Sequence, residues 1–137
     1  YAGLEEEIRG VMPEFDDLKL ARTDPYAFNA NWKFIFDAME CYHCPVIHPE
    51  VMGENTYVEL SFEITNHDRW ALHFIRGNRD VISGKTEGSV TYDLNADQKY
   101  LDTYIWWMWP NIYLVIHQGD PNFKVLLGMP SDAGMAP

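Results

Sequence analysis

The stretch "ECYHCPVIHPE", residues 40–50, brings an acid, two cysteines and two histidines within nine positions. These two cysteines are the only ones in a chain of 137 residues. Carboxylate, thiolate and imidazole groups are the side chains with which proteins hold transition metals. Three kinds of metal site use such residues, and the spacing of the ligands separates them.

Two of these metal sites fit the stretch poorly. A structural zinc site would use Cys41 and Cys44, but the sequence has no second cysteine pair. His48 and a distant histidine would have to complete it, while a helical His43 would point about 100° away from Cys44. A di-iron site repeats Glu-x-x-His on two helices, and that pattern occurs once here, at Glu40 and His43. Both cysteines are therefore interpreted as small buried packing residues.

The third kind of site, a mononuclear iron(II) held by two histidines and a carboxylate, fits His43 and His48. Residues five apart diverge by about 140° on a continuous helix, so Pro45 must kink or tighten the turn between them. Glu40 lies three residues before His43, where it could accept a hydrogen bond from that imidazole. The alternative for Glu40 is purely structural, as the third residue of a capping box opened by Asp37.

The flanking sequence predicts the elements that carry this stretch. "NWKFIFD", residues 31–37, alternates in the period of two expected of a strand. A helix is then predicted to start at residue 37 or 38, short or kinked because of Pro45. Near the N-terminus, Leu4, Ile8 and Val11 are spaced as in a short amphipathic helix closed by Pro13.

Beyond Gly53 the patterns are those of antiparallel strands. "TYVELSFEI" alternates a wet face with a dry face of Val58, Leu60, Phe62 and Ile64. Further strand patterns cover residues 69–77, 89–94, 100–118 with an interruption at Pro110, and 123–130. The expected fold is α+β, a curved antiparallel meander of about five or six strands that grips a helix.

Residues 31–50, "NWKFIFDAMECYHCPVIHPE", and the later Trp109-Pro110-Asn111 resemble motifs of the Rieske non-haem iron oxygenases, the ring-hydroxylating oxygenases. The match is to the catalytic domain of their α subunits, which has a helix-grip (Bet v 1-like) fold. The resemblance implies that His43 and His48 bind iron and that Glu40 takes the place of the acid linking this iron to the Rieske cluster of a neighbouring subunit. Two departures are Glu40, where the family more often has Asp, and Ala38, where it usually has Asn.

The same resemblance implies a larger protein around residues 1–137. Cys41-Tyr-His43 is not followed by a C-x-x-H pattern, so this chain cannot bind the [2Fe-2S] cluster itself. The chain is therefore interpreted as a partial, incomplete catalytic domain, with the Rieske domain N-terminal to Tyr1 and a C-terminal helix and third iron ligand beyond Pro137. Fe(II), O2, NAD(P)H used through a reductase or ferredoxin, and a homotrimer or larger assembly are implied, and the fragment alone is expected to be inactive.

The tryptophans and the local motif suggest a substrate. Alternation places Trp107 and Trp109 on one face of a strand and Trp106 on the other. Two aromatic rings could bind a quaternary ammonium group by cation–π contact, and "ECYHCP" with "HPE" is more similar to the glycine betaine, choline and carnitine branch of the family. The expected reaction is hydroxylation of an N-methyl group and oxidative demethylation.

Two other functions are kept open, an aromatic ring-hydroxylating dioxygenase and a non-enzymatic helix-grip module that binds an apolar ligand. In the module the two motif histidines would only line the pocket. The remaining histidines are interpreted as ordinary polar core or surface residues: His67, His73 and His117.

The composition indicates which kinds of binding partner and which cellular compartment to expect. With 10 basic against 21 acidic residues and a net charge of −11, the chain lacks a phosphate-binding surface, so no nucleic acid partner is expected. The acidic residues between Glu5 and Asp17 are most simply a solvated face. The longest apolar run, "YIWWMWP", is far shorter than the roughly 20 residues of a membrane span. Two cysteines form no disulfide framework, which favours the cytoplasm.

Overall fold

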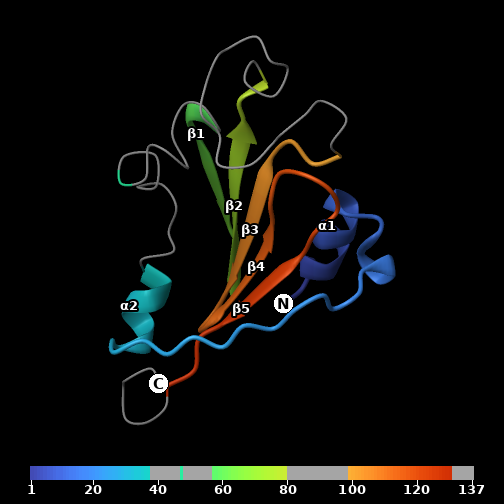
Figure 1. Ribbon diagram of the computed structural model, residues 1–137. Coiled ribbons are helices and arrows are strands. Elements are labelled where there is room, and N and C mark those ends of the chain that lie inside the picture. The colour runs from blue at the N-terminus through green and yellow to red at the C-terminus, as the bar shows by residue number, and fades with distance from the viewer. Residues whose placement is uncertain (38–46, 48–56, 80–98, 131–137) are drawn as a thin grey trace.

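A computed structural model describes residues 1–37, 47, 57–79 and 99–130 of the chain (Figure 1). In this part a twisted antiparallel sheet is the central element, with helices lying beside it (Figure 1). The elements in chain order are α1 (Leu4–Val11), the 3-10 turn η1 (Phe15–Asp17), α2 (Trp32–Asp37), β1 (Tyr57–Asn66), β2 (Trp70–Gly77), β3 (Thr103–Met108), β4 (Ile112–Ile116) and β5 (Lys124–Leu127).

The strands of the described part pair in the order in which they occur in the chain. The sheet order is β1-β2-β3-β4-β5, and every neighbouring pair is antiparallel. The single interrupted strand expected over residues 100–118 is a hairpin of β3 and β4, because the chain turns at Trp109–Asn111. The predicted α+β fold with an antiparallel meander is confirmed.

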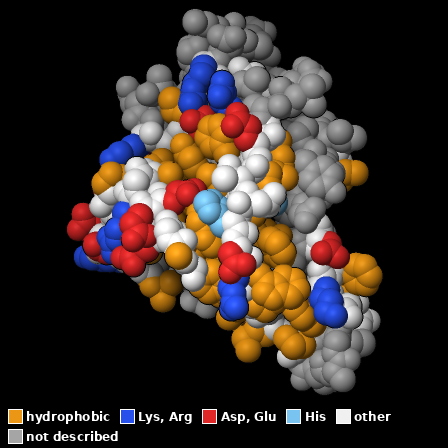
Figure 2. All heavy atoms as spheres, turned by 180° about the vertical axis from the view of Figure 1, so that it is seen from behind, with side chains coloured by type: hydrophobic (Ala, Val, Ile, Leu, Met, Phe, Trp, Pro, Cys, Tyr) orange, Lys and Arg blue, Asp and Glu red, His pale blue; other side chains and the backbone are white. Residues whose placement is uncertain are grey.

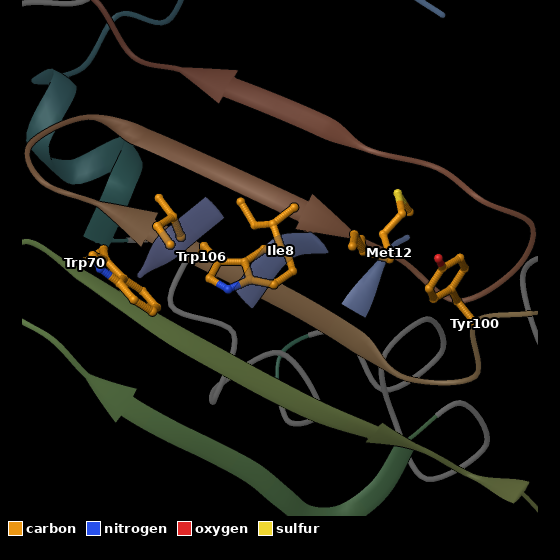
Figure 3. Packing of buried hydrophobic residues seen from close by; sticks show 7 residues of the cluster. Ile8, Met12, Trp70, Tyr100 and Trp106 are labelled. Atoms are coloured by element: carbon orange, nitrogen blue, oxygen red, sulfur yellow. The ribbon is translucent and has the colours of Figure 1, made fainter. Parts of the chain in front are cut away.

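Helix α1 covers one face of the sheet, which we call the α1 face. Leu4 and Ile8 are buried at helical spacing, and Met12 just after the helix is fully buried. They pack against a cluster that includes Trp70 and Trp106 (Figure 3). The predicted N-terminal helix is therefore confirmed, and burial of its apolar stripe is what holds it on the sheet.

The acidic residues near α1 are mostly solvent-exposed and partly paired. Arg9 lies 2.9 Å from a carboxylate oxygen of Glu5 and 2.7 Å from one of Asp16. Glu14 pairs with Lys99 and accepts a hydrogen bond from the Tyr100 hydroxyl at 3.0 Å. Seen from behind, charged side chains gather at the margin of the molecule where α1 lies, whereas hydrophobic side chains are exposed over the lower part (Figure 2). These contacts agree with the predicted solvated face.

The opposite side of the sheet, which we call the α2 face, has its own hydrophobic cluster. Ile75, Ile105, Tyr113 and Val115 are buried in it. Trp32 of α2 packs against this cluster, as do three partly buried residues from the strands: Phe62, Trp107 and Leu126. The sheet is therefore packed on both sides, with a different helix on each.

The strand predicted for residues 31–37 is wrong, because residues Trp32–Asp37 form helix α2. The side chain of Asn31 accepts a hydrogen bond from the Lys33 amide at 3.0 Å, and its carbonyl accepts one from the Phe34 amide at 3.0 Å. Asn31 thus caps the helix and satisfies an amide that would otherwise lack a partner. A helix start at residue 37 is also wrong, because Asp37 already belongs to α2, and the alternative start at residue 38 lies outside the described residues.

The wet and dry faces expected for β1 are found only in part. Phe62 is half-buried on the α2 face, but Ile64 is 49% exposed. Within the described part β1 pairs only with β2, so its outer side has no neighbouring strand to cover it. The strand predicted for residues 89–94 lies outside the described residues. No helix in the described ranges is long and apolar enough to span a membrane.

Candidate functional site

Helix α2 leads directly into the predicted iron motif. Trp32 packs against the α2 face, and Asp37, the last described residue of α2, precedes Glu40 by three positions. Glu40, His43 and His48 lie outside the described residues, so their roles as electron bridge and iron ligands stay predictions. Ile47, next to His48, is helical and 62% exposed.

The three histidines in the described part have other surroundings. No group of three or more His, Cys, Asp or Glu among these residues could hold a metal ion. His67 is stacked on Trp70 with ring centroids 3.6 Å apart, and the buried His73 meets Phe62 edge-on at 5.4 Å. The assignment of His43 and His48 as iron ligands therefore rests on the sequence motif alone.

The two tryptophans predicted to bind substrate are in contact. The rings of Trp107 and Trp109 meet edge to face, with centroids 5.9 Å apart and an interplanar angle of 88°. Trp107 is half-buried on the α2 face, whereas Trp109, in the turn after β3, is 59% exposed. Trp106 is fully buried on the α1 face, so the predicted alternation is confirmed for Trp106 and Trp107. Trp107 therefore shares a sheet face with α2, and Trp109 contacts it from the turn.

The α2 face also carries buried polar residues, among them His73, which was expected to be an ordinary core or surface residue. In the pairing of β2 with β3, His73 lies opposite Ile105, and Thr103 lies opposite Ile75. His73 and Thr103 are buried, and the two isoleucines belong to the hydrophobic cluster of this face. His117 lies directly after β4, and its side chain is half-buried. The period of two within each strand could have indicated which side chains share a face. The pairing between strands is also needed to show that residues of different strands lie close together.

His117 is held in its neutral form. Burial lowers the pKa of its imidazole from 6.5 to about 4, and the nearby positive charge of Lys124 adds to this effect. Its backbone is fixed by Asn122, whose side chain accepts a hydrogen bond from the His117 amide at 3.2 Å and donates one to its carbonyl at 3.0 Å. The His117 imidazole is therefore neutral at neutral pH.

The depressed pKa of His117 predicts that the protein loses stability in mild acid. The unfolded chain gains a proton on this imidazole below pH ~6.5 while the folded protein does not, so stability falls as the pH drops from 6.5 towards about 4. Between neutral pH and pH ~5 the loss is roughly 2 kcal/mol. Urea unfolding of the full-length protein at both pH values measures it.

The matched variants are His117→Gln and His67→Gln, the second at an exposed histidine. His117→Gln should flatten the dependence of unfolding free energy on pH, whereas His67→Gln should leave it unchanged. An equal pH dependence in His117→Gln and the unmodified protein would show that this imidazole is not the group responsible.

Comparison with known proteins agrees with this arrangement. The chain is 30% identical over 132 residues to the oxygenase subunit of carnitine monooxygenase from Acinetobacter baumannii, covering 96% of this chain and 33% of that protein. It is 28% identical over 132 residues to the same subunit from Escherichia coli (strain K12), covering 96% and 32%. The chain thus spans about a third of the length of these curated relatives.

Solved structures give the same result. A quaternary ammonium Rieske monooxygenase in complex with an inhibitor is 26% identical with a TM-score of 0.72, over 97% of this chain and 32% of that chain. A second structure of a quaternary ammonium Rieske monooxygenase, described for its insights into carnitine oxidation and inter-subunit electron transfer, is 25% identical with a TM-score of 0.70, over 97% and 33%.

The family itself is shown by a match that covers most of the sequence. Residues 15–127, which include α2, the motif and all five described strands, match the ring hydroxylating alpha subunit (catalytic domain) family. The chain therefore belongs to the ring hydroxylating alpha subunit family, within the region of its catalytic domain.

Proposed function

We propose that this chain is part of the catalytic domain of a Rieske-type non-haem iron oxygenase that uses O2 to oxidise a small quaternary ammonium compound. The observation that carries the proposal is the similarity to carnitine monooxygenase oxygenase subunits, at 30% identity over 96% of the chain and 31% identity over 93% of it. The motif with Glu40, His43 and His48 lies inside the family match.

His43 and His48 would hold the iron through imidazole nitrogens, a donor set that suits iron(II) when a carboxylate completes it. The third ligand is expected beyond Pro137. When bound, the iron supplies the dioxygen chemistry that attacks a substrate C–H bond. Glu40 would accept a hydrogen bond from the outer nitrogen of His43, which fixes the tautomer of the ligand and raises its basicity.

The full-length protein would need further parts. A Rieske domain N-terminal to Tyr1 would bind the [2Fe-2S] cluster, and a reductase or ferredoxin would deliver electrons from NAD(P)H. Because the resemblance gives Glu40 a place on an electron path between subunits, a homotrimer or larger ring follows. The cytoplasmic location and the inactivity of the isolated fragment remain predictions from the sequence.

The described residues would bind and orient the substrate on the α2 face. Trp107 and Trp109 offer aromatic faces to the cation, and the apolar cluster beside them excludes water. A hydroxyl group placed on a carbon bonded to the quaternary nitrogen makes that product unstable. The hydroxyl proton is lost, the C–N bond breaks with its electron pair leaving on nitrogen, and an aldehyde and a tertiary amine form.

Oxygen uptake by the full-length protein with its reductase tests the proposal. Carnitine or γ-butyrobetaine should stimulate uptake and yield a tertiary amine with an aldehyde, formaldehyde if an N-methyl group is attacked. The control substrate replaces the quaternary nitrogen by carbon and should not stimulate uptake. Turnover of naphthalene instead would favour the ring-hydroxylating dioxygenase. Ligand binding without any oxygen uptake would favour the binding module.

A further inference from the structure

The indole nitrogen of Trp107 is buried and has no hydrogen-bond partner among the described residues. A buried N–H group left unpaired costs about 1–3 kcal/mol. Proteins pair nearly all such groups, so an exception in a native structure calls for an explanation. A donor that a ligand satisfies is one such explanation.

Burial alone does not explain the unpaired nitrogen, because two other tryptophans buried in the sheet have partners. The indole nitrogen of Trp70 donates to the carbonyl of Ala2 at 3.3 Å. That of Trp106 donates to a carboxylate oxygen of Glu7 at 3.3 Å. Both lie on the α1 face, where the N-terminal helix and its first residues supply acceptors. Trp107 is on the α2 face.

The position of Trp107 links it to the proposed site. Its backbone neighbours across the sheet are Ala71 on β2 and Tyr113 on β4. Trp32 of α2 packs on the same cluster, and Trp109 lies edge-on at 5.9 Å. The nitrogen therefore belongs to a residue on the sheet face against which α2 packs.

A quaternary ammonium group cannot satisfy this nitrogen. It has no lone pair, so an indole binds it only through the π face. An N–H donor requires an acceptor elsewhere on the same molecule, and a carboxylate is the strongest because the hydrogen bond is charge-assisted. A substrate that carries a cation at one end and an oxygen acceptor at the other would use both the aromatic π faces of the tryptophan pair and the N–H donor of Trp107.

Resting on the proposed function, we propose that Trp107 determines specificity by donating its indole N–H to a carboxylate of the bound substrate. The substrate class is then zwitterionic, a quaternary ammonium compound that also bears a carboxylate. Trp107 acts in binding and selection, and the bond-breaking chemistry takes place elsewhere in the site.

The test compares two ligands of similar size with the full-length protein, without reductase so that no turnover occurs. γ-Butyrobetaine carries a carboxylate, and pentyltrimethylammonium has an ethyl group in its place. Calorimetry should show that Trp107→Phe, which keeps an aromatic ring but lacks the N–H, weakens γ-butyrobetaine binding about 10-fold. Its affinity for pentyltrimethylammonium should change less than about 2-fold. Trp106→Phe is the matched control and should leave the ratio of the two affinities unchanged.

The indole proton resonances of the unmodified protein give a second measurement that needs no variant to fold. γ-Butyrobetaine should shift one buried indole N–H signal downfield, and pentyltrimethylammonium should not. Equal losses for both ligands in Trp107→Phe, or indole signals that respond identically to both, would overturn this inference and leave the proposed function standing. If the unmodified protein binds neither ligand, the proposed substrate is wrong, and this inference falls with it.

Discussion

Alanine at His43 or at His48 should remove mononuclear iron from the full-length enzyme and lower its turnover by more than about 100-fold. Removing a residue that only supports a metal ligand typically lowers metal affinity or activity by up to about 100-fold. Removing the ligand itself should lower them further. Metal analysis gives the iron content per subunit, and oxygen uptake gives the activity. The absorbance of the [2Fe-2S] cluster should persist, because the proposed Rieske domain would bind the cluster through other residues.

His67→Ala is the matched control for these variants. His67 is exposed at the turn between β1 and β2 and stacks on Trp70, so its loss should leave the iron content unchanged. Iron that remains bound when His43 and His48 are both alanine would contradict the assignment and favour the non-enzymatic module.

Trp106→Ala should destabilise the catalytic domain by about 3–5 kcal/mol, the usual cost of deleting a large core side chain. Trp106 is fully buried between the sheet and α1, and its ring stacks on Tyr104 with centroids 5.9 Å apart. The variant also removes the hydrogen bond to Glu7. The midpoint of urea unfolding, followed on the full-length protein, measures the loss.

Val125→Ala provides the comparison, since this β5 side chain is 61% exposed. Its unfolding free energy should stay within about 0.5 kcal/mol of the unmodified protein. Trp106→Phe should lie between the two variants because it keeps most of the buried ring area. A Trp106→Ala protein as stable as Val125→Ala would mean that α1 does not depend on this contact.

The parts of the fold with long, regular patterns were predictable from the sequence. Leu4 and Ile8 mark α1 by their helical spacing, and the alternation in residues 69–77 marks β2. Helix α1 buries the face that its spacing predicted, and β2 forms where a strand was predicted. The strand order was less predictable, because β2 pairs with β3 across residues 78–102, where a further strand was predicted at residues 89–94.

The error at α2 has a definite physical origin. Six residues, Trp32 to Asp37, are too few to separate a period of two from a period of 3.6 when most of them are apolar. The decisive residue was Asn31, whose side chain caps the helix, yet it was counted as the start of a strand. The capping signal was instead assigned to Asp37, six residues too late.

The candidate site was predictable in its ligand types but not in its surroundings. Spacing and resemblance indicate His43 and His48, since the chemistry of iron limits which residues can bind it. The unpaired nitrogen of Trp107 and the neutral His117 could not be found in the same way. Their properties depend on which atoms cover them, and those atoms come from other strands.

The position of α1 has a kinetic consequence. Each strand of the described sheet pairs with the next one in the chain, and these connections are short except for residues 78–102 between β2 and β3. The contacts of α1 instead join residues far apart in sequence: the Trp106–Glu7 hydrogen bond spans 99 positions, and the Tyr1 hydroxyl reaches the Trp109 carbonyl across 108. Closing such long loops costs more conformational entropy, which slows the formation of these contacts. We expect the β3–β4 hairpin to form early and α1 to dock last, so that hydrogen-exchange labelling during refolding would protect the hairpin amides before those of the helix.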